Sequence, residues 1–245
     1  MTFPYRKGRA DFPVLSPIPA EDLRPSDPKA ASASNVLSLP GASRLRATVL
    51  SIHTQHQTGE MQVEMMRLRK RIFIDSKGWD LPTERDLEFD QYDTPQSRSI
   101  VVHEYGEILA GIRILPTTAR CGAYSYMLRD AQLGLIEDIP DYILYEPAPV
   151  APHIWEATRL FVSPEVDAEH RMLVQTRLMT ALSVAASAEG ATHVIGIVPA
   201  IFKRWLSKLG MHALPLGPKL EIAGDRIQAA VFPVGGHGQG GTGPH

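Results

Sequence analysis

Residues 154–198 contain the pattern that most restricts the fold of this chain. An apolar segment at 154–162 is followed by a long helical segment at 168–189, which ends at Gly190, and then by a short apolar segment at 193–198. A strand, a helix and a strand in this order predict a right-handed crossover to a parallel or splayed neighbour. The chain therefore needs a sheet that is covered by helices.

The other segments predict further strands and helices around this unit. Apolar residues at steps of three and four predict a helix at 60–73, with Thr58 as its N-cap. Two apolar segments at 99–104 and 109–115 flank a turn, which predicts a β-hairpin. A short helix at 202–209 and a closing strand at 228–233 complete the expected elements: a mixed sheet with helices on it.

The ends of the chain differ in composition from its centre. Residues 1–43 hold seven of the twenty prolines, with Ala and Ser between them, and such a segment buries too little apolar surface to offset its ordering entropy. We expect a flexible arm over 1–43, a folded domain over 44–234 and a disordered Gly-rich tail over 235–245. No internal repeat is present in the sequence.

The overall composition excludes several classes of protein. The 245 residues carry a net charge of −2, which does not favour bulk binding to nucleic acid. The single cysteine, Cys121, excludes an intrachain disulfide framework and a multi-cysteine zinc site, and no HExxH spacing occurs, so no metal is expected. The sequence has neither a signal peptide nor a membrane-spanning apolar run, and we expect a cytoplasmic location with no membrane partner.

Acidic and aromatic residues between 73 and 93 have two interpretations each. Asp90 and Asp93, three apart in FDQYD, form either a solvated turn or a carboxylate pair that recognises a cation, and Glu88 is a third carboxylate or a surface residue. Trp79 either covers the edge of the core or holds a cation over its ring. Phe73 ends the apolar helical series and is expected in the core.

The arginines and the remaining glutamate are harder to explain as surface residues. Arg69 is a solvated helix residue if taken alone, but Arg113 lies within the apolar segment AGIRIL, where a buried charge needs a partner. Alternation along the strand leaves a surface position open. Glu156 and Arg159 are three apart in WEATRLFV and point to opposite faces of a regular strand. They share one site only if the strand bends or bulges, or if Arg159 acts from the other side.

Taken together, these residues resemble a known pattern. They stand in the order and spacing of the acyl-homoserine-lactone synthases, the LuxI-type autoinducer synthases: Arg69, Phe73, Trp79, Asp90, Asp93, Arg113, Glu156 and Arg159. The resemblance spans roughly residues 61–234. It implies an α/β protein with a three-layer α/β/α, GNAT-like acyltransferase fold and a mixed central sheet.

The resemblance also implies a reaction and roles for the residues. S-adenosylmethionine would be a substrate, with no cofactor required, and its amine would attack an acyl thioester before its carboxylate displaces methylthioadenosine to close a lactone for quorum sensing. We expect Glu156 as the general base. The catalytic set would be Glu156, Arg159 and Arg113, and the S-adenosylmethionine site Arg69, Phe73, Trp79, Asp90 and Asp93.

The acyl donor implied by the resemblance is usually an acyl-acyl-carrier protein, with acyl-CoA as the other source. Lys203, Arg204 and Lys208 form a basic stretch on the expected short helix. Their side chains either dock the acidic carrier protein or make an ordinary solvated helix face.

Two other functions compete with the synthase. A GNAT-type N-acyltransferase that uses acyl-CoA normally binds pyrophosphate at a glycine-containing turn, but the corresponding segment, VSPEVDAEHRML, has no glycine. A binding protein that keeps the fold without catalysis would tolerate loss of the charged residues, yet all eight are present. Release of methylthioadenosine distinguishes the synthase from both.

Overall fold

The structure is a computed structural model that describes residues 36–37, 44–199, 206–207, 212–222 and 224–234. All of its described elements belong to the compact unit Asn35–His245. The expected short helix at 202–209 lies outside the described residues except for Leu206 and Ser207, which are helical.

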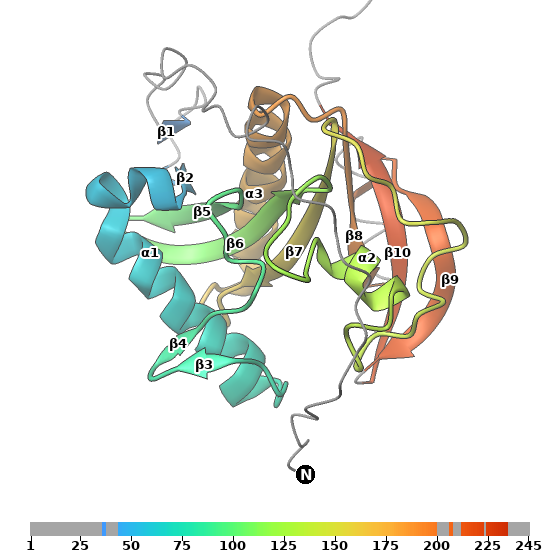
Figure 1. Cartoon of the computed structure of the whole chain (residues 1–245). Helices are drawn as coiled ribbons and strands as arrows, with labels where there is room; N and C mark the ends of the chain where they lie inside the picture. The colour runs from blue at the N-terminus through green and yellow to red at the C-terminus, as the bar shows by residue number, and fades with distance from the viewer. Residues whose placement is uncertain (1–35, 38–43, 200–205, 208–211, 223, 235–245) are drawn as a thin grey trace, which may run out of the picture. The chain divides into compact units, whose positions relative to one another are not determined.

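Eight strands of the described residues form one sheet (Figure 1). Their order across the sheet is β1 (Val36–Leu37), β2 (Arg46–Leu50), β5 (Arg98–Glu104), β6 (Glu107–Pro116), β7 (Ile154–Val162), β8 (His193–Pro199), β10 (Asp225–Pro233) and β9 (Leu214–Ile222). All neighbours pair antiparallel except β7 and β8, which are parallel. The sheet is therefore mixed, as the strand–helix–strand pattern predicts, and β3 (Thr83–Glu84) pairs with β4 (Leu87–Glu88) in a separate ribbon.

Helices cover the sheet on both faces (Figure 1). One face carries α1 (Gln55–Arg69), its π-helical continuation η4 (Lys70–Ser76) and the short α2 (Met127–Gln132), and the other carries α3 (Ala168–Ala188). A 3₁₀ turn, η3 (Ile52–Thr54), joins β2 to α1. The three-layer α/β/α arrangement is confirmed.

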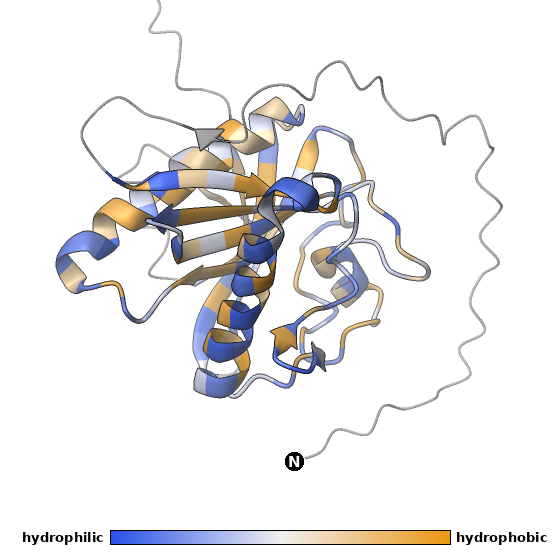
Figure 2. Cartoon of the chain, turned by 90° about the vertical axis from the view of Figure 1, so that its left-hand side faces the viewer, coloured by the Kyte–Doolittle hydropathy of each residue, from blue (hydrophilic) through white to orange (hydrophobic). Residues whose placement is uncertain are grey.

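Apolar side chains from alternate strand positions build a core on each face. Ile100 and Val102 of β5 pack with α3, whereas Val101 between them packs with α1 and Phe73. Figure 2 shows hydrophilic residues along the side of α1 that faces the viewer, with the apolar strands behind it. Successive residues of β5 are thus buried in cores on opposite faces of the sheet, which explains why the strand is a continuous apolar run in the sequence.

Local signals account for most element boundaries. The side chain of Asp167 caps α3 by accepting from the N–H of His170 at 2.8 Å, and Gly190 after the helix has a φ of 84°, which favours glycine. The hairpin turn at Tyr105 and Gly106 is confirmed. Thr58 lies at a kink between two helical segments of α1 and has non-helical φ and ψ of −131° and 18°, but its hydroxyl donates to the carbonyl of Thr54, so it does not form the predicted side-chain cap.

Several elements were missed because their sequence patterns are weak. β2 and α2 are short, and β9 contains two prolines and a glycine, which mask a strand pattern. β1 lies within the segment predicted as a flexible arm and pairs with β2. The division of the chain into arm, domain and tail stays a prediction.

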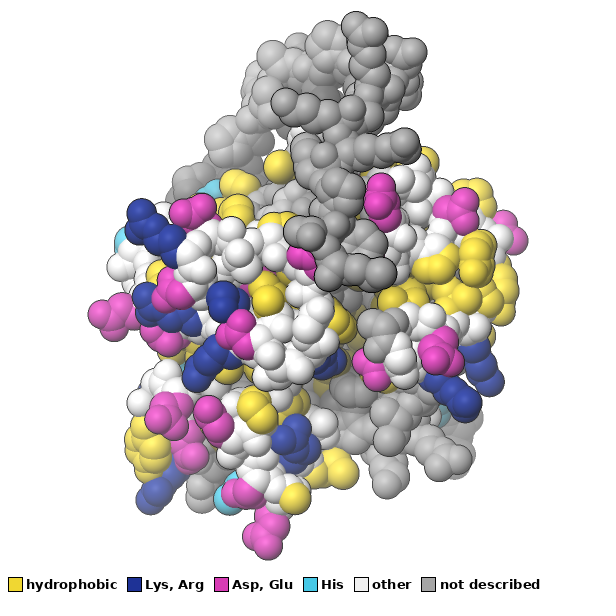
Figure 3. All heavy atoms as spheres, turned by 90° about the horizontal axis from the view of Figure 1, so that it is seen from below, with side chains coloured by type: hydrophobic (Ala, Val, Ile, Leu, Met, Phe, Trp, Pro, Cys, Tyr) yellow, Lys and Arg dark blue, Asp and Glu magenta, His cyan; other side chains and the backbone are white. Residues whose placement is uncertain are grey.

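Charges of both signs are mixed on one face of the molecule. Figure 3 shows lysine and arginine side chains interspersed with aspartate and glutamate on the face that it presents. No helix within the described ranges is long and apolar enough to cross a membrane.

Gly217 of β9 holds this edge strand close to the segment before β7. A Cβ atom at Gly217 would lie 1.8 Å from the carbonyl oxygen of Ile143, which is backbone and has little room to move. We expect Gly217→Ala to lower the free energy of unfolding by about 1–3 kcal/mol, measured by urea denaturation. Gly59→Ala is the matched control, since nothing lies within 4 Å of its added Cβ; equal effects of the two substitutions would contradict the packing described here.

Candidate active site

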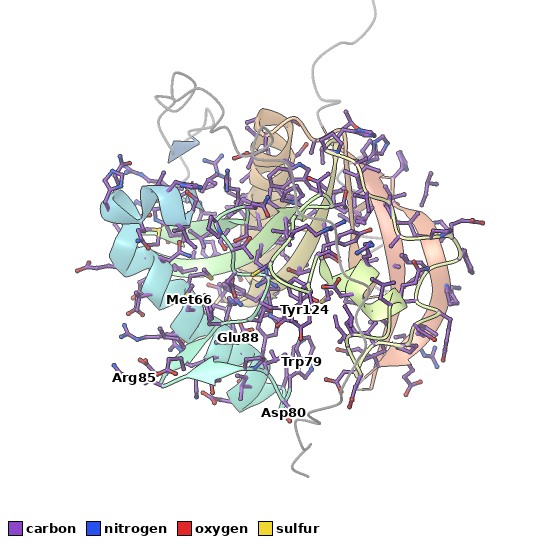
Figure 4. The ribbon with its side chains drawn as sticks, in the orientation of Figure 1. Met66, Trp79, Asp80, Arg85, Glu88 and Tyr124 are labelled. Atoms are coloured by element: carbon purple, nitrogen blue, oxygen red, sulfur yellow. The ribbon has the colours of Figure 1, made fainter. Side chains whose placement is uncertain are left out.

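Three arginines and three carboxylates meet in one buried network between α1 and the sheet. The arginines are Arg69, Arg113 and Arg159, and the carboxylates are Glu88, Asp90 and Asp93. Figure 4 shows Glu88 in front of the sheet, on the side that carries α1. The formal charges of these six side chains cancel, so the network resolves the cost of burying each charge alone.

Arg69 enters the network from the end of α1, where the helix changes to π-helical geometry. Its guanidinium donates to Asp93 through two nitrogens at 2.8 and 2.9 Å and also donates to Glu88. Arg69 is 1% exposed and Glu88 is fully buried. The surface interpretations of both residues are therefore wrong.

Arg113 lies at the centre of the network. It contacts both oxygens of Asp90 at 2.5 and 3.0 Å, an oxygen of Asp93 at 3.0 Å and, through Nε, the hydroxyl of Thr158 at 3.0 Å. The guanidinium fork suits such paired contacts, which fix direction as well as charge. The alternative of a surface position for Arg113 is excluded, because the side chain is 1% exposed.

Arg159 joins the same network because β7 bulges. Arg113 pairs with Thr158 while Gly111 pairs with Phe161, so β7 contains one more residue than β6 between these pairs. Arg159 takes up the extra residue with a φ of 54°. Its side chain donates to Glu88 at 3.0 Å and to Asp90 at 2.7 Å. In a regular strand Arg159 would point to the opposite face of the sheet, and the bulge turns it to the face that carries the network.

The opposite charges of the network shift the pKa values of Asp93 and Arg113. Burial would raise the pKa of Asp93, but the charges of Arg113 and Arg69 outweigh burial and keep this pKa well below its usual range. For Arg113, burial would lower the pKa, and the charges of Asp90 and Asp93 raise it instead. Proton transfer near neutral pH is therefore not a property of these groups.

Glu156 lies on the same face of β7 but outside the set of ion pairs. Its two carboxylate oxygens accept from the backbone N–H groups of Met127 and Leu128, at 2.8 and 2.7 Å, at the start of α2. The side chain is 1% exposed. Burial raises the pKa of Glu156 to about 7, although the two N–H groups and Arg113 act in the opposite direction. Glu156 is thus able to exchange a proton near neutral pH.

A further carboxylate, Asp130, anchors the segment that holds Glu156. Asp130 is fully buried and accepts from the N–H and hydroxyl of Ser125 and from the hydroxyl of Tyr92, the last at 2.9 Å. Its charge also contributes to the raised pKa of Glu156, after burial as the main cause. The sequence did not assign Tyr92, Asp130 or Thr158 to the site, although Tyr92 lies inside FDQYD and Asp130 ends the segment MLRD.

Aromatic rings lie beside the network at the end of η4. Phe73 and Trp79 are stacked with ring centroids 5.1 Å apart, and the guanidinium of Arg159 lies 5.8 Å from the centroid of Phe73. Phe73 is buried, as expected, and Trp79 is partly exposed. The ammonium of Lys77 lies 4.9 Å from the centroid of Trp79. This ring therefore already accommodates a cation.

The structure thus brings seven of the eight expected residues into one region, with Glu156 of β7 beside them, held by backbone N–H groups at the start of α2. The three residues expected to dock a carrier protein, Lys203, Arg204 and Lys208, lie outside the described residues. In the described part of the chain, no group of three or more His, Cys, Asp and Glu side chains is arranged to hold a metal ion.

Comparison with known proteins identifies the family of this chain. The family model described as autoinducer synthase matches residues 53–238, a range that contains every residue of the network and Glu156. The chain belongs to the autoinducer synthase family. Members of this family are acyl-homoserine-lactone synthases, and the enzyme is therefore an acyltransferase.

Curated relatives in this family cover most of the autoinducer synthase domain. An acyl-homoserine-lactone synthase of Pseudomonas aeruginosa is 30% identical over 189 residues, which are 76% of this chain and 86% of that protein. One of Aeromonas hydrophila is 26% identical over 175 residues, 69% of this chain and 77% of the relative.

Solved structures of related enzymes share the fold. The synthase LasI has a TM-score of 0.63 at 22% identity, over 77% of this chain and 89% of that one. The CoA-dependent synthase BjaI, solved with SAM and isopentyl-CoA, has a TM-score of 0.62 at 21% identity, over 77% and 82%. TofI, in a ternary complex with an inhibitor and MTA, has a TM-score of 0.59 at 25% identity, over 76% and 90%.

The raised pKa of Glu156 predicts a specific pH dependence of stability. A carboxyl group whose pKa is higher in the folded state stabilises the fold below its unfolded value of 4.5, and this contribution is lost as the pH rises through about 7. Between pH 4 and 8, the free energy of unfolding of the wild type should therefore fall by about 3 kcal/mol relative to Glu156→Gln. Urea denaturation of both proteins across this range tests the difference.

Glu137→Gln is the matched control for this experiment. Glu137 is exposed, so its replacement should leave the pH dependence of stability close to that of the wild type. A constant difference between wild type and Glu156→Gln at all pH values would show that Glu156 titrates as an ordinary carboxylate.

Proposed function

We propose that this autoinducer synthase transfers an acyl chain from a thioester to the amine of S-adenosylmethionine and then closes the lactone. In the first step the amine attacks the thioester carbonyl, a C–N bond forms and the thiol leaves. In the second step the substrate carboxylate attacks its own γ-carbon and displaces methylthioadenosine as a neutral thioether. The product is an acyl-homoserine lactone, a quorum-sensing signal.

The observation that carries this proposal is the position of Glu156 beside the charge-neutral network. An amine becomes a nucleophile only after it loses a proton, and a base is most effective when its pKa lies near the working pH. Glu156, with a pKa of about 7, meets this condition, whereas Asp93 is held ionised by Arg113 and Arg69. We assign Glu156 as the general base, acting directly or through water.

The network and the aromatic rings supply complementary groups for the rest of the substrate. The carboxylates of Asp90 and Asp93 would attract the ammonium and sulfonium groups, and Trp79 would offer its ring to the sulfonium. The position of the Lys77 ammonium over this ring supports a cation site there. The guanidinium of Arg159, at the exposed edge of the network, would orient the substrate carboxylate.

Apolar side chains next to Glu156 are suited to contact the acyl chain. The parallel ladder of β7 and β8 ends at Ala157 and Gly196, although β7 continues to Val162 and β8 to Pro199. On the Glu156 side, this end of the ladder adjoins the apolar cluster that includes Ile195, Ile197, Ile227, Ala229 and Leu216. A thioester that enters between the two strands would place its carbonyl near the base and its chain in this cluster.

We propose acyl-acyl-carrier protein as the donor, with acyl-CoA as the alternative. The carboxylate of Asp167 already accepts from the N–H of His170 at the start of α3, so an acidic group occupies the place where a GNAT enzyme would bind pyrophosphate. The basic stretch at 203–208 would dock the acidic carrier. A cytoplasmic location also belongs to this proposal, since Cys121 is a free, exposed thiol.

Release of methylthioadenosine tests the proposed reaction. Purified protein incubated with S-adenosylmethionine and either acyl-carrier protein or acyl-CoA donors should form methylthioadenosine and an acyl-homoserine lactone, detected by chromatography and mass spectrometry. Trp79→Ala should raise the KM for S-adenosylmethionine about 2- to 30-fold, the range expected for loss of a cation–π contact. Tyr142→Ala is the matched control, because Tyr142 is 61% exposed and lies outside the network.

The outcomes separate the competing functions. An acylated amine without methylthioadenosine would favour a GNAT-type N-acyltransferase, and no turnover with any donor would favour a binding protein. Either result would overturn the proposed lactone synthesis.

Charge reversal tests the proposed docking of the carrier protein. Lys203→Glu with Arg204→Glu should raise the apparent KM for the carrier-linked donor by about tenfold or more, with little change in the KM for S-adenosylmethionine. Lys219→Glu, at an exposed position on β9, is the matched control. Unchanged kinetics in the double variant would remove this docking surface.

A further inference from the structure

A cavity with charged residues in its lining lies at the turn between β5 and β6, away from the arginine–carboxylate network. Its volume is about 400 Å³ and its described lining residues are Arg44, Arg46, His103, Tyr105 and Gly106. A cavity of this size is typical of sites for small molecules. The network residue Arg113 pairs with Ser99 of β5. His103 lies four residues farther along β5, which is about 13 Å from Ser99 along the strand.

Strand pairing brings the polar groups of this cavity together. Arg46 of β2 lies directly opposite His103 of β5 in the antiparallel register, which places their Cβ atoms about 5 Å apart. The guanidinium of Arg44 lies 5.6 Å from the centroid of the Tyr105 ring. Two cationic groups, an imidazole and an aromatic ring therefore surround one space.

The two arginines of this cavity have no acidic partner in the described ranges. No ion pair there includes Arg44 or Arg46, in contrast to the network arginines, and both side chains are exposed. Glu104 and Glu107 pair across the end of the hairpin. Glu104 follows His103 along β5 and so points to the opposite face of the sheet. The cavity thus has a net positive wall.

His103 has a ring nitrogen that is available to a ligand as a hydrogen-bonding group. The side chain is 9% exposed, and its Nε2 lies 2.9 Å from the hydroxyl oxygen of Thr48. Its Nδ1 is buried and has no hydrogen-bond partner within the described ranges. If Thr48 donates to Nε2, Nδ1 carries the proton and is a donor without an acceptor, which is costly in a folded protein.

The charge state of His103 agrees with this arrangement. Burial and the charge of Arg46 lower its pKa, which favours the neutral ring. In the tautomer in which Thr48 donates to Nε2, an anion would supply the missing acceptor for Nδ1–H and would balance the positive charges of Arg44 and Arg46.

We propose that this cavity binds the phosphate group of a small organic phosphate. A phosphate dianion matches the two guanidinium groups in charge, and it accepts from them and from Nδ1–H of His103 at once. The volume exceeds what a phosphate alone would fill, so the ligand carries an organic part, and the Tyr105 ring favours a planar one. This inference does not depend on the reaction proposed above.

Calorimetric titration of the full chain tests the site with three probes: phenyl phosphate, inorganic phosphate and benzoate. We expect phenyl phosphate to bind most tightly and benzoate most weakly. Arg46→Gln should raise the Kd for phenyl phosphate about tenfold or more, the loss expected for one charged hydrogen-bond partner. Arg226→Gln, which removes an exposed arginine of β10, should leave this Kd unchanged.

Nuclear magnetic resonance of ¹⁵N-labelled histidine tests the contact directly. The Nδ1 signal of His103 is assigned as the one that is absent from the spectrum of His103→Asn. Phenyl phosphate should shift this signal in the wild type, and this result does not depend on the stability of the variants. Equal Kd values for Arg46→Gln and Arg226→Gln, or an unshifted His103 signal, would overturn the site. Inorganic phosphate binding as tightly as phenyl phosphate would overturn the assignment of an organic ligand.

Discussion

The mutual neutralisation of buried charges is the constraint on which the rest of this structure depends. Arg69, Arg113 and Glu88 are almost completely removed from water, and each would be very costly there without its partners. Because each of them makes more than one ion pair, α1, the segment after β4 and strands β6 and β7 are held in one arrangement. The network therefore sets the distances between these elements, and in the proposed function it also presents charge to the substrate.

Two local distortions allow this network to close. The first is the change from α1 to the π-helix η4, which follows directly after Arg69 and contains Phe73, whose ring lies 5.8 Å from the guanidinium of Arg159. The bulge of β7 turns Arg159 to the face on which Arg113 and Thr158 already lie. Both distortions carry a conformational cost, which buried ion pairs and aromatic packing offset, and such distortions are frequent at functional sites.

The contrast between Glu156 and the network carboxylates shows how one site keeps two kinds of acid. Asp93 faces the guanidinium groups of Arg69 and Arg113, which keep its pKa well below its usual range. Glu156 faces two backbone N–H groups in a buried position, and its pKa rises to about 7. Asp130 secures the start of α2 and adds negative charge nearby, which separates the roles of the carboxylates further.

By itself, the sequence determined the order of the main strands and helices, because apolar periodicity and capping residues are local signals. It also pointed to Arg113 and Glu156, since charges within apolar strands need partners. Only the tertiary structure decided that Glu88 is buried, that Tyr92, Thr158 and Asp130 support the site, and that Arg159 reaches the network. The physical reason is that the burial of a side chain, its ion pairs and a strand bulge depend on elements far apart in the chain. The residue pattern of one strand does not specify which elements will pack against it.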